Sequence, residues 1–396
     1  MSDSAPASAP ANPEGPLSGI RVLDFGRYIA GPFCAALLAE FGADVIRVER
    51  PEGGEDRFLM PIAQDGTGAL FMQMNRNKRS LALDPKSDTG RAATRRLIAS
   101  ADIVVANLPP ATLKKMGLDY DTLRALREDI ILINLTAYGD QGPWHTRPGF
   151  DGVGQVMTGG AWLTGENGTP RRAQVNWVDH LTASNAAFGA VLALFERQRS
   201  GRGQEVRGAL LRSALSANAP TLIEQATIQR DRQPCGNRGL GSAPNNLFEA
   251  RDGGWLVMQT VGPTLFERLA RLAGYPEWLE DPRFDTDESR VVHEMAMLEP
   301  LAEWCLQQER DALVERLCEA GIPAAPVLSP SETLQHPQVL ATGQLQEMAI
   351  PGMATPGLVS AAPISLLGTP GSLRRPPPGI GEHNDEILAE LGLNAR

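Results

Sequence analysis

The first two hundred residues alternate between short apolar runs and helix-like stretches, and this alternation restricts the possible folds more than any other feature. A strand is predicted at 19–25, a helix at 33–41 and a second strand at 43–49, with Pro32 suited to the first helical position. The same alternation predicts further strands at 79–83, 103–106, 130–135 and 205–209, and helices at 89–101, 120–127 and 181–198. Such a series is typical of a doubly wound parallel sheet, an α/β fold that binds ligands at the carboxyl ends of its strands.

The character of the sequence changes after about residue 230. Residues 247–260 predict a hairpin with an Asp-Gly turn, and amphipathic helices are expected at 264–273, 295–308 and 310–320. We therefore expect a smaller α+β domain. The predicted division is a disordered tail at 1–16, a large α/β domain at 17–225, a small domain at 226–334, and a C-terminal segment at 335–396 that returns to the large domain.

Composition excludes several classes of function. The formal net charge of −10 argues against a nucleic-acid partner, because a phosphate backbone is held by clustered Lys and Arg. The four cysteines and five histidines are scattered without metal-ligand spacing, which predicts reduced thiols and no metal site. Neither a secretory leader nor an apolar run of about 18 residues is present, so we expect a cytoplasmic protein without a membrane partner.

Familiar catalytic and cofactor motifs are missing. The turn after the first strand reads GRYIAGP, which is not the G-x-G-x-x-G of dinucleotide-binding folds, and neither a P-loop nor the G-x-S-x-G of serine hydrolases occurs. Asp179 and His180 are adjacent, so their side chains diverge and do not form a charge-relay pair. We interpret His180 as a structural residue at the start of a helix.

Basic residues recur close to the ends of the predicted parallel strands. They are Arg50, Arg76, Lys78, Arg79, Lys86, Lys114, Lys115 and Arg147. Scattered Lys and Arg are usually a solvated surface. If these side chains instead meet at one edge of the sheet, they would suit a nucleotide with several phosphates. The pattern alone leaves both interpretations open.

Eight short motifs, in order, give the chain a resemblance to a known family. They are RVLDF with AGP and GADVI at 21–46, NRNKRS at 75–80 followed by Leu83 and Asp84, Asn107 with a loop ending at Met116-Gly117, RPGFD at 147–151, VDHLT at 178–182, SGRGQEV at 200–206, GIPAAPV at 321–327 and GEHNDEIL at 381–388. Together they resemble the class III CoA-transferases, the family of formyl-CoA transferase and carnitine CoA-transferase, to which α-methylacyl-CoA racemase also belongs.

The resemblance implies a fold, a partner and a mechanism. It implies a large α/β domain, a smaller second domain and an interlocked homodimer. It also assigns the catalytic nucleophile to Asp179, which without the family would be interpreted as a helix N-cap. The carboxylate would attack an acyl-CoA thioester, pass through a mixed anhydride and an aspartyl-CoA thioester, and deliver CoA to a carboxylic acid. Coenzyme A is then a substrate, and no resident cofactor is implied.

The resemblance also assigns the residues that contact CoA. They are Tyr28, Arg50, Leu83, Lys86, Asn107, Leu108 and Lys115. Formyl-CoA transferase has an Arg at the position of Lys115 and a Phe at that of Leu108. Lysine keeps the charge but loses the bidentate fork of arginine. Asp151 and Arg147 are expected to support the site.

Candidate residues of the acyl pocket differ from those of formyl-CoA transferase. Apolar Ile29, Leu70 and Phe150 stand where that enzyme has a glutamine and two tyrosines, and 236–241 replaces its four-glycine loop. Fewer hydrogen-bond partners disfavour a small dianion such as oxalate. A larger or more apolar acyl group is expected, with Arg238 available to meet a second carboxylate.

Two alternatives to transfer remain. A racemase needs an acid or base on each side of the α-carbon, and the racemase relatives supply a histidine where this chain has Phe150, which cannot move a proton. A non-catalytic CoA-binding protein is disfavoured because an aspartate is retained at 179. The partners expected are an acyl-CoA, a carboxylic acid and a second copy of the chain, whereas the identities of donor and acceptor are not specified by the sequence.

Overall fold

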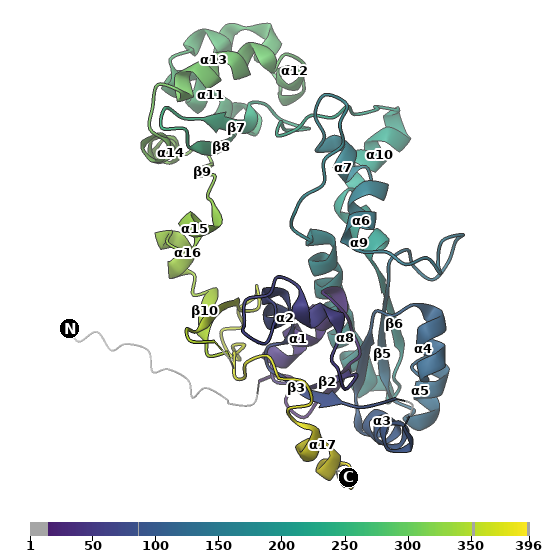
Figure 1. The fold of residues 1–396 in the computed structure, drawn as a ribbon. Coiled ribbons are helices and arrows are strands. Elements are labelled where there is room, and N and C mark those ends of the chain that lie inside the picture. The colour runs from purple at the N-terminus through teal and green to yellow at the C-terminus, as the bar shows by residue number, and fades with distance from the viewer. Residues whose placement is uncertain (1–14, 86, 351–352, 394–396) are drawn as a thin grey trace, which may run out of the picture. The chain divides into compact units, whose positions relative to one another are not determined.

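The computed structural model describes residues 15–85, 87–350 and 353–393 (Figure 1). The chain divides into two compact units. The first contains the described residues up to Thr158, Ala173–Ile223 and the described residues from Thr342 onward. The second contains Gly159–Arg172 and Glu224–Ala341. Residues 159–172, which the sequence places in the large domain, thus group with the second unit, and the expected tail at 1–16 lies almost wholly outside the described residues.

A six-stranded parallel sheet forms the centre of the first unit. Its strands are β1 (Arg21–Asp24), β2 (Asp44–Glu49), β3 (Lys78–Ala82), β4 (Ile103–Ala106), β5 (Ile131–Thr136) and β6 (Glu205–Ala209). The order across the sheet is β3-β2-β1-β4-β5-β6, and all neighbours pair in parallel. The predicted α/β fold is confirmed. The chain reverses its direction of travel between β1 and β4, which is where such sheets open a crevice for ligands.

Helices cover both faces of this sheet (Figure 1). Alternate residues of each strand point to opposite faces. Val22 and Ile103 therefore join a core with α1 (Ala30–Glu40) and α8 (Trp177–Ser200). Leu23 packs on the other face, in a core with α3, α4, α5 and α17. The helices of that face are α3 (Asp88–Ser100), α4 (Pro110–Met116), α5 (Tyr120–Leu126) and α17 (Asn384–Glu390).

Local signals explain where several of these helices begin and end. The Ser87 hydroxyl accepts a hydrogen bond from Gly90 N–H at the start of α3, and the Asp119 carboxylate accepts one from Thr122 N–H at the start of α5. Helix α8 ends at Gly201, whose φ of 69° is left-handed. By length and composition α8 would be apolar enough to cross a membrane, but eight of its residues are buried within the fold, where it contacts α1 and β6.

The remaining elements of the first unit are short. They are η1 (Glu55–Phe58), α2 (Ala69–Asn75), α6 (Asp151–Met157), α9 (Leu210–Ala217), β10 (Leu345–Met348) and β11 (Gly357–Ser360). Strands β10 and β11 pair in antiparallel fashion. Helix α10 (Ala219–Ile228) lies across the division between the units.

The second unit has its own core around a three-stranded antiparallel sheet. The predicted hairpin is confirmed as β7 (Asn245–Glu249) and β8 (Trp255–Gln259), and β9 (Ala324–Pro326) adds a third strand. Apolar side chains of these strands pack with helices of the same unit. Its helices are α7 (Gly160–Leu163), α11 (Gly262–Ala273), η2 (Pro276–Glu280), η3 (Pro282–Phe284), α12 (Asp287–Val292), α13 (Met295–Cys305), α14 (Arg310–Glu319), α15 (Pro330–Thr333) and α16 (Pro337–Ala341).

Three of the basic residues that recur near the ends of the predicted strands are buried inside the protein. Arg76 pairs with Glu40 at 2.9 Å, Lys78 with Asp24 at 2.6 Å and Arg79 with Asp44 at 2.6 Å, and all three cations are buried. They lie just before or at the beginning of β3, and therefore at the amino ends of the strands. The sequence pattern had suggested the carboxyl ends. Neither interpretation that the sequence left open, a solvated surface or a site for phosphates, holds for these three residues, because they pair with carboxylates that are distant in sequence.

Candidate active site

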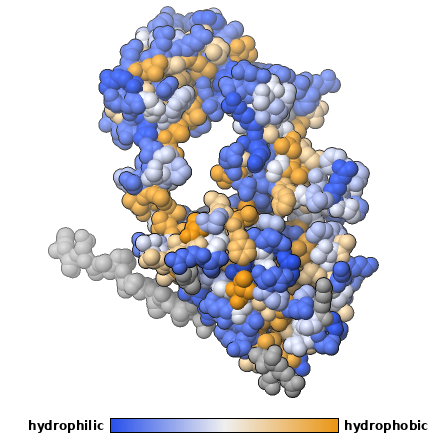
Figure 2. Space-filling view, in the orientation of Figure 1, coloured by the Kyte–Doolittle hydropathy of each residue, from blue (hydrophilic) through white to orange (hydrophobic). Residues whose placement is uncertain are grey.

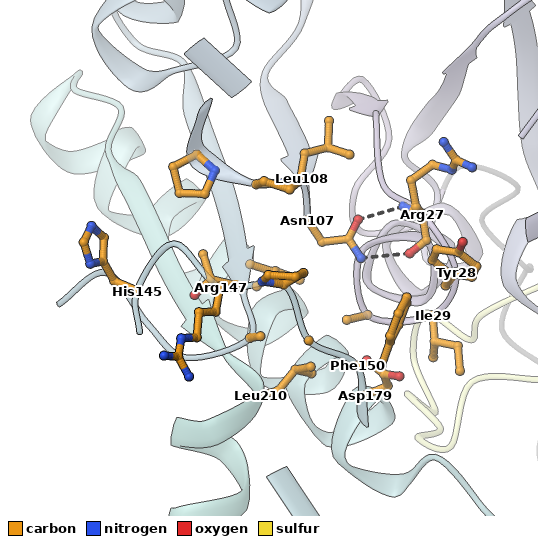
Figure 3. Close-up of a pocket in the computed structure, with 18 of the residues that line it drawn as sticks. Arg27, Tyr28, Ile29, Asn107, Leu108, His145, Arg147, Phe150, Asp179 and Leu210 are labelled. Carbon is orange, nitrogen blue, oxygen red and sulfur yellow. Dashed lines mark hydrogen bonds between the residues drawn. The ribbon is translucent and has the colours of Figure 1, made fainter. Parts of the chain in front are cut away.

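A pocket opens at the carboxyl ends of the central strands, where the sheet order reverses. Its volume is about 250 Å³, and residues of the first unit line it. They follow β1 (Arg27, Tyr28, Ile29, Ala30), begin η1 (Glu55), follow β4 (Asn107, Leu108, Pro109, Pro110), end or follow β5 (Leu135, Thr136, Ala137, His145, Arg147, Pro148, Gly149, Phe150) and lie at the start of α8 and α9 (Asp179, Leu210). Figure 3 shows Tyr28, Phe150 and Asp179 at one end of this pocket and His145 at the other.

Asp179 is the third residue of α8, whose N-cap is Asn176. The carboxyl group therefore lies inside the first helical turn and is not the helix cap. Its residue is only 9% exposed. Burial, and secondly the negative charge of Asp151, raise the pKa of Asp179 to about 7. Near neutral pH the pocket thus contains a carboxyl group balanced between its acid and carboxylate forms.

Asp151 is the group that caps this turn. Its Oδ2 accepts hydrogen bonds from the N–H groups of Val178 at 2.8 Å and Asp179 at 3.1 Å, and Gln155 donates to its other oxygen. The residue is buried and begins α6. Because its oxygens are engaged in this way, Asp151 fixes the backbone that carries Asp179.

The pocket has a second carboxylate, Glu55, in a different environment. Arg27 and Arg50 both form ion pairs with it, and its side chain is largely exposed. Its own backbone N–H and the Arg27 guanidinium lower the pKa of Glu55 to about 2. Glu55 is therefore a fixed anion, whereas Asp179 is the weakly acidic carboxyl group of the pair.

Aromatic side chains form part of the wall. The Tyr28 and Phe150 rings meet edge to face, with centroids 5.3 Å apart and planes at 89°. Tyr28 has a φ of 62°, a left-handed backbone that is uncommon for a bulky residue. Ile29, next in sequence, is buried. The acyl-pocket candidates Ile29 and Phe150 thus line the same cavity as Asp179.

Asn107 joins the loops that follow β1 and β4 (Figure 3). Its Oδ1 accepts from Arg27 N–H at 2.7 Å, and its Nδ2 donates to the Arg27 carbonyl at 2.8 Å. One side-chain amide therefore satisfies both backbone groups of one residue. These two bonds connect neighbouring parallel strands at the position where the sheet order reverses.

Arg147 and His145 bring basic groups to the other end of the pocket. The Arg147 guanidinium lies 4.2 Å from the centre of the Trp144 ring, and Trp144 meets Tyr138 edge to face. His145 Nδ1 lies 2.9 Å from the Gly142 carbonyl. The stacked ring limits the directions that the Arg147 cation can take.

The structure gathers about half of the predicted site residues at the pocket. The lining includes Tyr28, Ile29, Asn107, Leu108, Arg147, Phe150 and Asp179. Leu70, Leu83, Arg50 and Lys115 belong to the same unit but do not line it, and the last two are exposed. Arg238 belongs to the second unit, where it pairs with Glu294. Lys86 lies outside the described residues.

Sequence reasoning missed several lining residues. Arg27 stands in the GRYIAGP turn, whose place after the first strand was a usable signal. Glu55 begins the short helix η1 and His145 lies in a loop, and no motif in the sequence alone places either of them. His180 is half-buried, bonds through Nδ1 to the Asn176 carbonyl and meets Phe33 edge to face, as a structural residue does.

Metal ligation has no basis in the described part of the chain. Within it, no three His, Cys, Asp or Glu side chains form a group that would hold a metal ion. The four cysteines are free thiols, and Cys34 and Cys305 are buried. The polar side chains that line the pocket carry carboxylate, guanidinium, imidazole, amide and hydroxyl groups.

Comparisons with known proteins give relatives that match nearly the whole chain. The sequence model of CoA-transferase family III matches residues 17–384. A succinyl-CoA–D-citramalate CoA-transferase from Chloroflexus aurantiacus is 34% identical over 381 residues, which cover 96% of this chain and 94% of the relative. A succinate–glutarate CoA-transferase from Agrobacterium fabrum is 35% identical over 393 residues, 96% of each chain.

A solved structure resembles the whole fold. It is that of a CaiB/BaiF family protein from Brucella suis, with a TM-score of 0.84 and 32% identity. The match covers 96% of this chain and all of the other.

Proposed function

This chain belongs to CoA-transferase family III, and we propose that it moves CoA from an acyl-CoA thioester to a carboxylic acid through a covalent intermediate on Asp179. Membership makes it an enzyme of the class III CoA-transferases. The nucleophile, its intermediates and the substrates are the proposal.

One observation carries the assignment of Asp179. Two carboxylates line the pocket, and their environments differ. Glu55 is held as an anion by two arginines, which weakens it as a nucleophile. Asp179 is buried, its pKa is raised to about 7, and among the described residues no hydrogen-bond donor offsets that rise. A carboxylate without such partners is the more reactive of the two.

The reaction proceeds by four acyl transfers. The Asp179 carboxylate attacks the thioester carbonyl, which forms a mixed anhydride and releases CoA thiolate. The thiolate attacks the aspartyl carbonyl, which forms an aspartyl-CoA thioester and frees the donor acid. The acceptor carboxylate attacks that thioester, releasing thiolate again and forming a second anhydride. Finally, the thiolate attacks the acceptor carbonyl, so that acceptor-CoA leaves and Asp179 is regenerated. No resident cofactor enters the scheme.

Stabilisation of each oxyanion needs hydrogen-bond donors. The N–H groups of Val178 and Asp179 are unsuitable, because Asp151 already accepts from both. Other N–H groups of the pocket loops must supply these bonds. The two bonds that Asp151 accepts favour a supporting role for it, in which we propose that it holds the turn that carries the nucleophile.

Trapping tests the covalent step directly. Enzyme incubated with its acyl-CoA and quenched with hydroxylamine or borohydride should carry the modification on the peptide that contains Asp179. Asp179→Ala should abolish transfer and still bind CoA, whereas the matched variant Glu55→Gln, at the other pocket carboxylate, should keep the modification. Full transfer by Asp179→Ala would contradict the mechanism.

We propose that exposed basic residues at the carboxyl ends of the strands hold the CoA phosphates. Arg50 directly follows β2, and Lys115 lies on α4, beyond β4. Replacing either by Ala should raise the KM for acyl-CoA roughly tenfold, as expected for a charge-assisted contact in partly solvated surroundings. Arg95→Ala, at an exposed residue of α3 outside this set of basic residues, is the control. An unchanged KM for both variants would exclude this anchoring.

The relatives point to a class of substrate. The two relatives described above are named for succinyl-CoA with D-citramalate and for succinate with glutarate, and succinate, citramalate and glutarate are dicarboxylic acids. We propose dicarboxylic acids as the first acceptors to be screened against this enzyme. Ile29 and Phe150 favour acceptors with a carbon chain between the two carboxylates over oxalate, which has none.

A racemase would need a second proton-transfer group across from Asp179. Phe150 cannot serve, and His145, the histidine of the lining, lies at the other end of the pocket (Figure 3). The enzyme should therefore not exchange the α-proton of a 2-methylacyl-CoA with deuterated water, yet should transfer CoA to an added acid. Rapid exchange without acceptor would favour the racemase instead.

A further inference from the structure

The side-chain amide of Asn107 forms two hydrogen bonds with the backbone of Arg27. Oδ1 accepts from Arg27 N–H at 2.7 Å, and Nδ2 donates to Arg27 C=O at 2.8 Å. Gly31 lies against the same amide, because a Cβ at residue 31 would stand 3.3 Å from both Cγ and Oδ1 of Asn107. The amide is therefore closely confined, and it holds the peptide groups on both sides of Arg27.

We call the two hydrogen bonds between Asn107 and Arg27 the Asn107 clamp. Tyr28, the residue after Arg27, has a strained backbone. Tyr28 adopts φ 62°, a conformation that costs a non-glycine residue free energy and persists only where the surroundings enforce it. Directly before Tyr28, Arg27 is held by hydrogen bonds to Asn107. Directly after Tyr28, Ile29 and Ala30 are buried. The Asn107 clamp thus fixes the residue directly before the strained one.

Buried polar groups fix the rest of the same turn. Gly26 N–H donates to Asp24 Oδ1 at 2.8 Å. Lys78 Nζ donates to Asp24 Oδ2 at 2.6 Å and to the Pro32 carbonyl at 2.8 Å. The chain is therefore held on each side of Arg27 and Tyr28, at Gly26 and at Pro32. Of these anchors, Asn107 is the one that lines the pocket and comes from the neighbouring strand.

The turn directs an aromatic side chain into the pocket. The Tyr28 ring meets Phe150 edge to face at 5.3 Å, and both residues line the cavity together with Asp179. We propose that Asn107 is a positioning residue, which holds the Arg27–Tyr28 turn and thereby sets the Tyr28–Phe150 ring pair that confines the acyl group at Asp179. The catalytic part of this inference rests on the proposed function, whereas its structural part does not.

This role differs from a direct contact with CoA, which the family resemblance assigns to Asn107. A residue that only binds CoA affects KM, and its removal leaves kcat intact. A residue that positions the walls around the reacting carbonyl affects kcat, because small displacements of reacting groups are costly. The two roles therefore predict different kinetics for the same variant.

Fluorine NMR reads the position of Tyr28 without any reaction. The chain has four tyrosines, at 28, 120, 138 and 275, so 3-fluorotyrosine labelling gives four signals. Tyr28→Phe identifies the Tyr28 signal by its loss, and Phe150→Leu should shift that signal because the neighbouring ring is removed. Asn107→Ala should shift or broaden the Tyr28 signal and leave those of Tyr120 and Tyr275 unchanged.

A matched control comes from the neighbouring strand. Asn134 in β5 also donates through its amide, to Glu205 at 2.9 Å, but does not line the pocket. Asn134→Ala should leave the Tyr28 signal where it is. If Asn107→Ala does not fold, Asn107→Asp retains the acceptor for Arg27 N–H and loses the donor to Arg27 C=O, and it should displace the signal by a smaller amount.

Kinetics then separate positioning from binding. Asn107→Ala should lower kcat about tenfold or more and leave the dissociation constant of CoA within about threefold. A Tyr28 signal that stays unmoved in folded Asn107 variants would overturn the inference, and so would a loss confined to CoA affinity. Because the NMR signal is read in the free enzyme, it would still report the Asn107 clamp if the transferase assignment failed.

Discussion

Asp179 is a carboxyl group whose surroundings penalise its charge. Burial raises its pKa to about 7, with the Asp151 carboxylate as the second cause. Asp151 is also the cap of the turn, since it accepts from the N–H groups of Val178 and Asp179. One residue thus fixes the backbone of Asp179 and makes its side chain a weaker acid.

The raised pKa predicts the pH dependence of the reaction. Only the carboxylate form attacks, and its fraction increases as the pH rises through about 7. The rate of acyl transfer at low acyl-CoA concentration should therefore increase with pH, with a midpoint near 7. Asp151→Asn removes a neighbouring negative charge and should move the midpoint to lower pH, although burial keeps it above that of an ordinary aspartate. A wild-type midpoint near 4 would contradict this environment for Asp179.

The same shift predicts a cost in stability. Folded protein holds the proton more tightly than unfolded protein does, so the stability contributed by this group falls as the pH rises from about 4 to about 7. Asp179→Asn removes the penalty. The variant should unfold less readily than wild type at pH 8, by at most about 4 kcal/mol, with a gap that shrinks as the pH falls toward 4. Denaturant unfolding at several pH values measures it, and a gap independent of pH would contradict the explanation.

Thr182, one turn beyond Asp179, has a buried hydroxyl. Among the described residues it has no hydrogen-bond partner. Thr182→Val keeps the shape and removes the unsatisfied group, so it should stabilise the protein by about 1 kcal/mol. Thr182→Ser, which keeps the hydroxyl and loses the methyl group, should instead destabilise it. Thermal unfolding of the two variants checks the signs, and a destabilised Val variant would indicate that the hydroxyl is satisfied in solution.

At the scale of elements, the β1–α1 turn depends on close packing between backbones. A Cβ at Gly31 would lie 3.0 Å from Gly26 Cα and 3.3 Å from Asn107. Neither neighbour can yield easily, because Gly26 bonds to Asp24 and Asn107 bonds to Arg27. The sequence AGP at 30–32 thus begins α1, and its glycine also leaves room for the loop that follows β4, the strand beside β1.

Gly31→Ala should therefore destabilise the protein, although alanine normally favours helices. We expect a loss of about 1–3 kcal/mol, as for other overpacked sites. Gly152→Ala is the matched control, since Gly152 is likewise the second residue of a helix, α6, and a Cβ there meets nothing within 4 Å. That control should be neutral or stabilising by up to about 1 kcal/mol. Equal effects of the two substitutions would show that the packing around Gly31 is not limiting.

At the scale of the whole molecule, α8 is apolar on a second face. Phe188, Val191, Leu192 and Phe195 follow helical spacing and are 46–67% exposed. Figure 2 shows that apolar residues are also exposed on the visible face of each unit. Contiguous exposed apolar side chains of this size usually mark an interface. We propose that a second copy of the chain covers this face of α8, in the homodimer that the family resemblance implies.

Light scattering coupled to size-exclusion chromatography tests the dimer. The wild-type enzyme should have twice the mass of the chain, and a variant with Phe188→Glu and Phe195→Glu should lose affinity between copies. Leu367→Glu, at a residue outside α8 that is 97% exposed, is the control and should remain dimeric. A monomeric wild-type enzyme at micromolar concentration would exclude the proposal.

Local pattern determined much of the architecture. Alternating apolar runs and helices specify a parallel sheet, because side-chain periodicity depends on neighbours a few residues apart. The strands β1 to β6 and the hairpin of β7 and β8 were predicted within a few residues. The family was also readable from eight ordered motifs, and the match over residues 17–384 confirms it. Short helices such as α2, α4 and α6 were missed, since about two turns carry little periodic signal, although α5, of the same length, was predicted.

Tertiary structure decided which charges are buried and which groups share the pocket. Arg76 and Lys78 resembled surface cations until Glu40 and Asp24, 36 and 54 residues away, proved to be their partners. Likewise, only folding brings Arg27 to Asn107, Phe150 to Tyr28 and Asp151 to the N–H groups of α8. The sequence determined the strands of the main sheet through local pattern, and it indicated the nucleophile candidate through motifs that resemble a known family. The pKa of Asp179 and the wall around it depend on burial and on long-range contacts, which exist only once the chain is folded.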